Sequence, residues 1–319
     1  MPYKFHDSRR GKFQKGRYRV TNWPTYNESL RRRGDLMIWV SEDVAQEWMA
    51  ARRQTRGGQR RYSDLAIEIC LTLRVAFRLA LRQTQGFMRS IAKLMGLALP
   101  VPDFSTLSRR GKGLKVAQKG RASDKPITLI VDSTGLKVHS EVGWNGHKHG
   151  AKGARKTWRK LHLALDPDSG DILASELTTE HVGDETALPS LLERVDAPVG
   201  RFLADGAYDG SGVSDCLAAA FGYEVDVVVP PPKNAVPGGN CQRNQHIEHI
   251  AKHGRMAWQA ATGYNQRSRI ETQIGRWKSV IGDRLHAKNI ENQTTETHIA
   301  ASALNRMSAF GRANYERVS

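Results

Sequence analysis

Two aspartates stand at positions where carboxylates commonly meet a substrate or a metal ion. Asp132 and Asp205 each end a short apolar run, "TLIVD" and "RFLAD". An acid at the carboxyl end of a strand points toward the crevice where α/β sheets bind ligands. The same pattern also fits an aspartate that forms a turn and caps the next element. A third observation is therefore needed before either aspartate can be assigned to chemistry.

Glu271 provides that observation, because it lies in the basic segment "YNQRSRIETQIGRWK" at residues 264–278. On one continuous helix, turning by about 100° per residue, Tyr264, Arg267, Glu271 and Lys278 share an arc of about 60°. Isoleucines and a tryptophan fill the neighbouring arc, so the helix could dock on a sheet with its polar stripe along the sheet's edge. The alternative is a solvated helix in which Arg267 and Glu271, four residues apart, form an ordinary salt bridge.

The overall composition favours a polyanionic partner. The 319 residues include 49 Lys and Arg against 32 Asp and Glu, and the net charge of +17 is most simply matched by nucleic acid. No apolar run is long enough to span a bilayer, and the basic N-terminus lacks the apolar core of a signal peptide. We therefore expect a cytoplasmic or nucleoid-associated protein with no membrane partner. The three cysteines are widely spaced without a Cys-x-x-Cys pair, which argues against a zinc ribbon or a disulfide framework.

Charge and hydropathy divide the chain into four expected parts. Residues 1–62 form a basic arm, since residues 1–61 carry fifteen Lys and Arg but six Asp and Glu. Residues 63–124 are expected to form a helical DNA-binding region with a basic linker. An α/β domain follows at residues 125–300, and a C-terminal helix or tail at residues 301–319.

The helical region has the parts of a helix-turn-helix motif. It is long and apolar, with an expected break near Gln85–Gly86. A proline-marked turn and a short basic helix follow in "PVPDFSTLSRRGKGL", where Asp103 or Ser105 could cap the helix. In a helix-turn-helix motif Arg109 and Arg110 would contact DNA. A plain helical hairpin fits the pattern equally well.

After the linker the hydrophobic period changes from helix to strand. "PITLIVDSTGLKV" predicts a buried strand that ends at Asp132, and two further strands flank the turn signal "PDSG" as an antiparallel hairpin. Helix, strand, helix and strand follow, with a strand ending at Asp205, a loop at residues 233–245 and further helices. Three strands in a meander, then alternating helices and strands, indicate a mixed α/β fold.

A second basic segment, "WNGHKHGAKGARKTWRK" at residues 144–160, has eight Lys, Arg and His residues and no acid. We expect it to follow a DNA backbone, with contacts from Lys156, Arg159 and Lys160, although a solvated loop fits the same composition. Asp209, just past the second aspartate, fits either an acid outside the direct ligand set or a turn residue.

The spacing of Tyr264, Arg267, Glu271 and Lys278 matches the Tyr–Arg–Glu–Lys signature of bacterial insertion-sequence transposases of the DDE type. "IVDSTGLKV" resembles the first catalytic block of that family and "FLADGAYDG" the second. The similarity extends from about residue 125 to residue 300. The resemblance implies a ribonuclease-H-like catalytic domain, a mixed sheet flanked by helices, preceded by a mostly helical basic DNA-binding region.

The resemblance also implies a metal-binding triad of Asp132, Asp205 and Glu271. Three carboxylates in a partly dry site repel one another, and divalent cations relieve that repulsion. Two Mg²⁺ ions, with Mn²⁺ able to substitute, would serve an in-line displacement at phosphorus. Asp132 would bridge the ions while the other two acids each hold one. By resemblance, Tyr264, Arg267 and Lys278 would grip phosphates next to the cut.

The resulting hypothesis is a DNA transposase that binds transposon ends, cleaves there as an endonuclease and joins the 3′-hydroxyl ends to target DNA. Its expected partners are the terminal inverted repeats, target DNA and further copies of the chain, as a dimer or larger homo-oligomer. One alternative is a captured DDE nuclease without strand transfer. Another is a non-enzymatic helix-turn-helix DNA-binding protein, and a basic RNA-binding protein has little support from an aromatic content of 7%.

Overall fold

The structure, a computed structural model, describes residues 17–36, 39, 44–54, 56–118, 120–121, 125–138 and 158–318. The chain forms two compact units, one of residues 1–38 with 307–319 and the other of residues 39–306. The finer division at residues 62, 124 and 300 stays a prediction. Among the described helices, none combines the length and apolar character needed to cross a bilayer.

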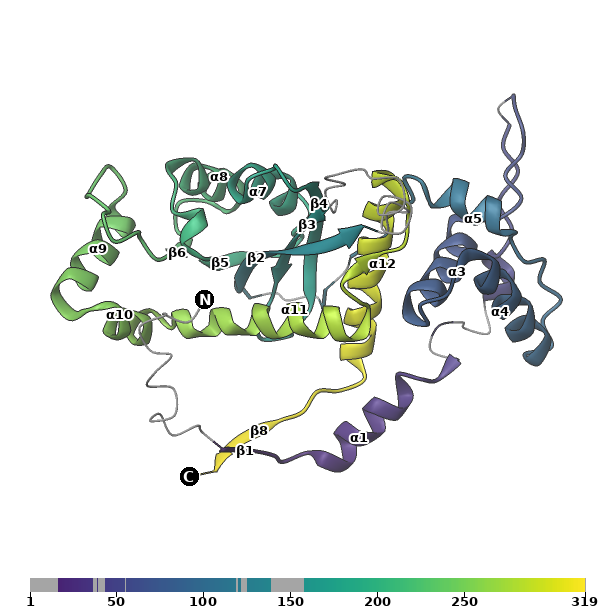
Figure 1. The fold of residues 1–319 in the computed structure, drawn as a ribbon, viewed down its shortest axis with the longest axis horizontal. Coiled ribbons are helices and arrows are strands. Elements are labelled where there is room, and N and C mark those ends of the chain that lie inside the picture. The colour runs from purple at the N-terminus through teal and green to yellow at the C-terminus, as the bar shows by residue number, and fades with distance from the viewer. Residues whose placement is uncertain are drawn as a thin grey trace, which may run out of the picture. The chain divides into compact units, whose positions relative to one another are not determined.

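The smaller unit is built on a two-stranded antiparallel ribbon. Strand β1 (Arg17–Val20) pairs with β8 (Tyr315–Val318), so segments close to the two ends of the chain lie side by side (Figure 1). Helix α1 (Trp23–Arg32) follows β1 and places two arginines in its last turn. Cations suit that end of a helix because the unpaired carbonyls there carry partial negative charge.

A mixed six-stranded sheet is the centre of the larger unit, in the order β4–β3–β2–β5–β6, with β7 beside the end of β2. Strand β3 runs antiparallel to both of its neighbours, β2 and β4, while β5, β6 and β7 run parallel to β2. This order confirms the predicted mixed α/β class and is consistent with a ribonuclease-H-like domain. The strands are β2 (Ile127–Val138), β3 (Trp158–Leu165), β4 (Ile172–Thr179), β5 (Val199–Leu203), β6 (Asp226–Val228) and β7 (Arg284–Leu285).

The predicted "PDSG" turn joins β3 to β4. The Asp166 carboxylate accepts hydrogen bonds from the backbone N–H groups of Asp168 and Ser169, at 2.9 and 3.2 Å. Gly170 takes a positive φ of 69°, which a residue with a side chain adopts only under strain. Local turn chemistry therefore sets this hairpin, as the sequence indicates.

The prediction that the first strand ends at Asp132 is wrong. Strand β2 continues to Val138, because its second half keeps pairing with β3 as far as Lys137 opposite Trp158. Asp132 therefore lies in the middle of a long strand, opposite Leu163. A local apolar run could not reveal this extension, which depends on a partner strand more than twenty residues away.

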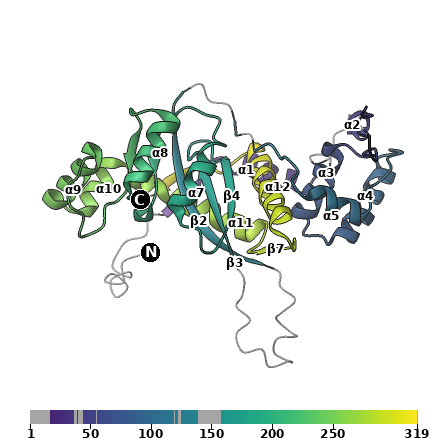
Figure 2. The same ribbon diagram turned by 90° about the horizontal axis from the view of Figure 1, so that it is seen from above.

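Helices cover both faces of the sheet (Figures 1 and 2). Leu129 and Val131 of β2 share a buried core with leucines of α7 (Asp184–Leu192) and α8 (Ser211–Phe221). Side chains alternate along a strand, so Asp132 belongs to the opposite face. There α11 (Ser268–Val280) packs against β2 and buries Ile270 and Trp277. The last helix, α12 (Ile290–Ala309), is buried on all sides in its middle, where residues 295–301 are buried without a break.

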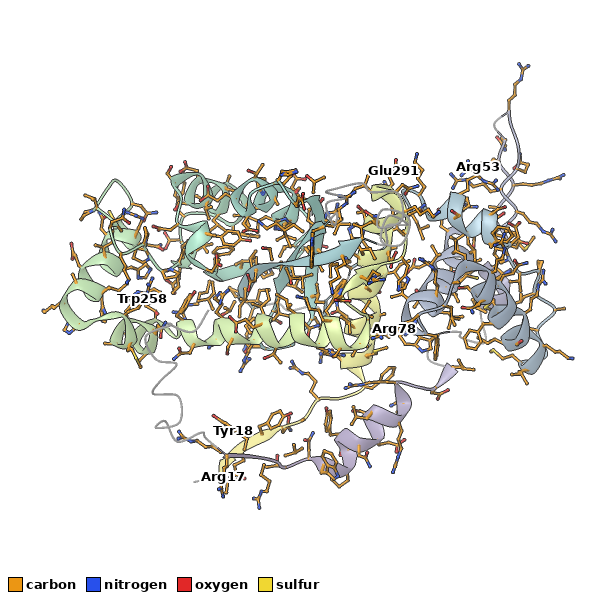
Figure 3. The ribbon with its side chains drawn as sticks, viewed as in Figure 1. Arg17, Tyr18, Arg53, Arg78, Trp258 and Glu291 are labelled. Atoms are coloured by element: carbon orange, nitrogen blue, oxygen red, sulfur yellow. The ribbon has the colours of Figure 1, made fainter. Side chains whose placement is uncertain are left out.

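The region before the sheet contains three helices that pack together: α3 (Asp64–Ala76), α4 (Leu81–Leu94) and α5 (Phe104–Gly111). The expected break at Gln85–Gly86 is wrong, since both residues lie inside α4. The chain breaks instead around Arg78, whose φ is 53°. The Arg78 guanidinium donates to the carbonyl oxygens of Ser279 and Val280 at the end of α11, a distant anchor that local sequence does not show (Figure 3).

Two further expectations concern helix starts. The cap of α5 is confirmed, because Asp103 accepts hydrogen bonds from the N–H groups of Ser105 and Thr106. The segment "SEDVAQEWMAARRQ" at residues 41–54 predicts a helix with Ser41 as its cap. The structure describes only the short α2 (Val44–Glu47) there, and Ser41 itself lies outside the described residues.

The expected loop at residues 233–245 ends earlier than predicted. Helix α9 (Cys241–His253) begins inside it, because the Asn240 side chain caps the helix by accepting from the N–H of Arg243 at 3.0 Å. Helix α10 (Arg255–Thr262) follows after Gly254, and the 3₁₀ turn η4 (Tyr264–Arg267) leads into α11.

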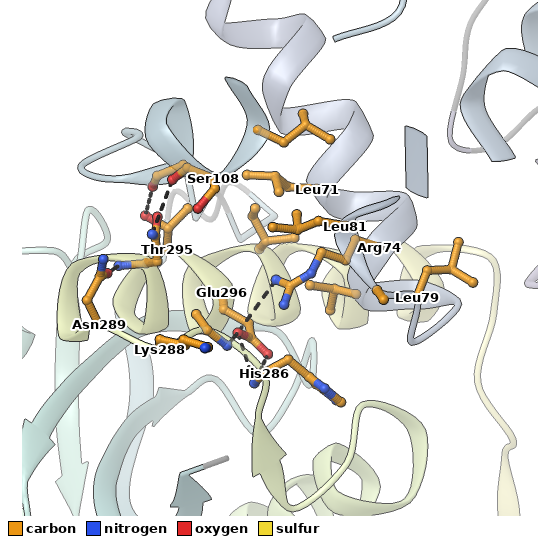
Figure 4. Close-up of a pocket in the computed structure, with 17 residues that line it drawn as sticks. Leu71, Arg74, Leu79, Leu81, Ser108, His286, Lys288, Asn289, Thr295 and Glu296 are labelled. Carbon is orange, nitrogen blue, oxygen red and sulfur yellow. Dashed lines mark hydrogen bonds and ion pairs between the residues drawn. The ribbon is translucent and has the colours of Figure 1, made fainter. Parts of the chain in front are cut away.

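A cavity of about 550 Å³ lies among α3, α5 and α12 (Figure 4). Its wall includes Glu296, which accepts hydrogen bonds from the N–H groups of His286 and Ala287 and pairs with Arg74 at 3.7 Å. None of the three predicted catalytic acids lines this cavity. The acids form a separate site.

Candidate active site

Neighbouring parallel strands bring the two aspartates together. In the β2–β5 ladder Ile130 lies opposite Leu203. Asp132 and Asp205 each follow two residues later, so they lie at corresponding positions on adjacent strands. Strand β5 ends at Leu203, and Asp205 caps the 3₁₀ turn η3 (Gly206–Tyr208) through the N–H of Ala207 at 2.9 Å. The predicted strand before Asp205 is confirmed, but it ends two residues earlier than predicted, so Asp205 lies just past it.

Glu271 reaches the aspartates from the first turn of α11, where a negative charge suits the helix dipole. The expected continuous helix from Tyr264 is wrong for its first turn. Gly263 has a φ of 63°, and residues 264–267 form the 3₁₀ turn before the α-helix starts at Ser268. Because the turn and the helix are joined directly, Arg267 and Glu271 still share one side.

The Arg267 guanidinium lies among all three acids. Its Nη2 is 2.9 Å from Asp132 Oδ2 and 3.9 Å from Asp205 Oδ2, and its Nη1 is 2.8 Å from Glu271 Oε1. The salt bridge between Arg267 and Glu271 that their spacing predicts is therefore present, as part of a larger cluster. One cation serves three carboxylates from three separate elements.

Burial is graded across the site. The Asp132 side chain is 14% exposed, whereas Asp205 is 41% and Glu271 57% exposed. Burial raises the pKa of Asp132, and the nearby charges of Asp205 and Glu271 act in the same direction, while Arg267 opposes them. Asp132, the most buried of the three carboxylates, therefore depends most on a positive partner, whereas the side chains of Asp205 and Glu271 face solvent.

The donor set fits a divalent cation. Three carboxylates surround one positive group, and oxygen ligands of this kind are those that Mg²⁺ and Mn²⁺ prefer. Within the described residues, no three acidic, histidine or cysteine side chains are close enough to hold one ion in the arrangement seen. In this arrangement the Arg267 guanidinium lies between the acids.

A further acidic residue, Asp184, lies behind Asp132, and no motif in the sequence points to it. Asp184 begins α7, and its Oδ2 lies 3.0 Å from Lys160 Nζ. Its Oδ1 lies 3.2 Å from His162 Nδ1. Burial opposes ionisation of Asp184, yet His162, Ser133 and Lys160 outweigh it and hold its pKa well below the usual range. Ser133 follows Asp132 directly, so this network supports the strand at the site from its other face.

The residues predicted to contact DNA have varied surroundings. Tyr264 packs against Trp258 with ring centroids 5.1 Å apart, and burial raises its pKa to about 12. Lys278 is exposed at the far end of α11. Lys160 pairs with Asp184 as described, and Arg159 Nε donates to Gln293 Oε1 at 3.0 Å.

The two arginines of the helical region that are predicted to contact DNA also differ in their surroundings. Arg109 is exposed, whereas Arg110 donates to the carbonyl of Tyr62 at 2.9 Å and pairs with Asp64. Lys156 lies outside the described residues, as does most of the basic segment around it. The DNA-contact assignments therefore stay predictions.

Two family models, both described as a transposase DDE domain, match the chain at residues 31–141 and 123–306. Similar solved structures include the piggyBac transposase synaptic complex with hairpin DNA, which is 10% identical with a TM-score of 0.36 over 93% of this chain and 78% of that one. The Drosophila P element transposase strand transfer complex is 13% identical with a TM-score of 0.29 over 86% and 69% of the two chains.

The second family match covers more than half of the chain and contains all three acids. It favours neither the captured nuclease nor the non-enzymatic DNA-binding protein. The Tyr–Arg–Glu–Lys signature is not itself tested by the match. On the family match, the chain belongs to the DDE transposases, metal-dependent enzymes that cut and transfer DNA.

Proposed function

We propose that this transposase cuts the phosphodiester bonds at the ends of an insertion sequence and joins the freed 3′-hydroxyls to target DNA. Asp132, Asp205 and Glu271 are proposed as the residues that hold the divalent ions. The observation that supports this is their convergence, from β2, the turn after β5 and α11, on the single guanidinium of Arg267. Three acids from elements far apart in the sequence would rarely contact the same cation by chance.

Two Mg²⁺ ions, with Mn²⁺ as a substitute, are the proposed cofactors, since Mg²⁺ favours a few carboxylates combined with water and phosphate oxygens. Bound ions would supply Lewis acidity to the attacking and leaving oxygens of an in-line displacement. Asp132 suits the role of shared ligand because it interacts electrostatically with both Asp205 and Glu271. Those two, more exposed, would each complete one ion's protein ligands.

Arg267 is proposed to act in two states. The guanidinium pairs with Asp132 and Glu271, and in the first proposed state this pairing neutralises the acids. When the ions take its place among the acids, the guanidinium has to leave the carboxylates, and a phosphate of the bound DNA is the nearest anion able to accept its planar fork. Tyr264 and Lys278, on the same segment, would hold neighbouring phosphates.

The proposed chemistry is two displacements at phosphorus. In the first, a water oxygen bonds to the phosphorus at the element's end while the bond from phosphorus to the 3′-oxygen breaks, leaving a 3′-hydroxyl and a 5′-phosphate. In the second, that hydroxyl bonds to a target phosphorus and displaces a target 3′-oxygen. Neither step needs a covalent bond to the protein.

The proposed DNA partners are terminal inverted repeats and a target duplex, and the net charge of +17 suits both. Two ends have to be held at once for the joining step, so we propose that the chain works as a homo-oligomer on DNA. The helices α3, α4 and α5 are a candidate helix-turn-helix unit for end recognition.

The test uses purified protein, Mg²⁺ and a labelled duplex carrying the DNA that flanks the gene. Asp132→Ala, Asp205→Ala and Glu271→Ala should each bind this duplex but neither cut nor join it. Asp168→Ala, which removes an 82% exposed acid at the β3–β4 turn, is the matched control and should retain activity. Cleavage by any of the three site variants would refute the assignment, and cleavage without joining by the wild type would favour the nuclease.

A further inference from the structure

The turn that carries Asp205 is held by an ion pair four residues further along. Arg243 Nε lies 2.8 Å from Asp209 Oδ1 and Nη2 lies 2.9 Å from Asp209 Oδ2, a two-pronged arrangement. The Asp209 side chain is 7% exposed. Paired forks of this kind fix direction as well as distance, which a single point charge does not. The turn from Asp205 to Asp209 therefore has one well-defined position relative to α9.

Arg243 also forms hydrogen bonds with the segments around that turn. Its Nη1 donates to the carbonyl of Val236 at 3.0 Å, in the loop before α9. Its backbone N–H is bonded to the cap residue Asn240, whose side-chain amide in turn donates to Ser214 of α8 at 2.9 Å. A single guanidinium thus joins the Asp205 turn, the preceding loop and the start of α9.

Helix α9 is itself fixed to the edge of the sheet. Gln242 accepts from the N–H of Val227 at 2.9 Å and donates to the carbonyl of Val225 at 3.1 Å, as a neighbouring strand would do beside β6. One turn later, His246 donates from Nε2 to the carbonyl of Val227 at 3.0 Å. Figure 1 shows α9 and α10 beside this end of the sheet. The two polar side chains replace the missing strand on an otherwise unpaired edge.

The same histidine connects α9 with the residues that lead to Glu271. Trp258 of α10 donates its Nε1–H to His246 Nδ1 at 3.0 Å and is fully buried. Its ring packs against Tyr264, which begins the turn that continues into α11 (Figure 3). The α9–α10 hairpin therefore touches the Asp205 turn at one end and the approach to Glu271 at the other.

We infer that the Asp209–Arg243 pair is a positioning device, through which the α9–α10 hairpin sets the spacing between Asp205 and Glu271. This inference rests on the proposed role of those two acids as metal ligands. Asp209 and Arg243 are engaged with each other, and Arg243 also with Val236, and the inferred role needs no contact with the metal or the DNA. Their effect is on geometry: with the pair broken, Asp205 can still bind an ion, but it is no longer held at a fixed position relative to Asp132 and Glu271, the other proposed ligands.

The test measures the affinity of the full-length protein for Mn²⁺ in the absence of DNA. The electron paramagnetic resonance signal of free Mn²⁺ reports how much of the ion stays unbound during the titration. Arg243→Lys keeps the charge but loses the fork, and Asp209→Asn keeps the shape but loses the charge. Each should weaken Mn²⁺ binding by about tenfold, as loss of groups that orient metal ligands commonly does. Affinity for the duplex from the flanking DNA, measured by gel shift, should stay within about twofold of wild type.

Arg121→Lys is the matched control, because Arg121 grips the 4% exposed Asp171 with a similar fork at 3.1 and 3.2 Å beside the start of β4. It should lower thermal stability without changing Mn²⁺ affinity. If Arg243→Lys is recovered unfolded, Asp209→Asn decides the question. Wild-type Mn²⁺ affinity in a folded Arg243→Lys or Asp209→Asn protein would overturn the inference. Wild-type affinity in Asp205→Ala would instead overturn the proposed function.

Discussion

Replacing Arg267 with glutamine should make metal binding tighter, although the residue lies in the active site. The Arg267 side chain is 16% exposed and pairs with an Asp132 side chain that is 14% exposed. At an effective dielectric constant of about 20, unit charges about 4 Å apart attract by about 4 kcal/mol. Desolvation of a largely buried pair offsets much of that attraction. We take about 1.5 kcal/mol as the net interaction that an incoming ion has to replace.

A difference of that size corresponds to about tenfold in affinity. Arg267→Gln should therefore bind Mn²⁺ about tenfold more tightly than the wild type in the absence of DNA. The metal-free variant should lose about 2 kcal/mol of unfolding free energy, because Asp132 is left buried without its cation. Added Mg²⁺ should then raise its Tm by more than it raises that of the wild type. DNA cleavage should fall, since the phosphate contact is lost.

The assay is the same Mn²⁺ titration, run beside thermal unfolding with and without Mg²⁺. Arg121→Gln removes an arginine from a comparable pair outside the site and should leave Mn²⁺ affinity unchanged. Unchanged or weaker Mn²⁺ binding by Arg267→Gln would show that the guanidinium does not compete with the ions, and that its place among the acids has another purpose.

Three further predictions concern the framework. Burial and the neighbouring Arg194 lower the pKa of His298 to about 4. As the pH falls from about 6.5 to 4, the unfolded chain therefore binds a proton at His298 that the folded chain does not, and the free energy of unfolding should fall by up to about 3 kcal/mol. His298→Gln should reduce this pH dependence when denaturant unfolding is measured at several pH values. Burial raises the pKa of the Cys70 thiol to about 12, so a thiol reagent should label the exposed Cys241 in the folded protein but Cys70 only after unfolding, as peptide mapping would show. Asp103→Ala should lower the free energy of unfolding by about 1 kcal/mol through loss of the α5 cap, and an unchanged urea midpoint would contradict this.

Features that depend on nearby residues could be predicted from the sequence. The hairpin at "PDSG", the cap at Asp103 and the strand before Asp205 each depend on a few adjacent residues. The three candidate acids were predicted partly from their local runs and partly from the spacing between Arg267, Glu271 and the residues around them.

Features that depend on distant partners could not be predicted. The length of β2 is set by pairing with β3, and the chain break at Arg78 is held by carbonyls two hundred residues away. Lys160 was expected on DNA because the residues around it are basic, yet the fold brings it to Asp184. The position of Arg267 between the acids depends on three elements meeting, which no single segment of sequence encodes.

Anomalous diffraction from crystals of the full-length protein soaked in Mn²⁺ tests most directly whether the three acids hold metal ions. We expect anomalous peaks among the carboxylates of Asp132, Asp205 and Glu271, with the Arg267 guanidinium withdrawn from its contacts with them. A fully loaded crystal with no peak among these three side chains, or with Mn²⁺ bound elsewhere while Arg267 stays among them, would contradict this expectation.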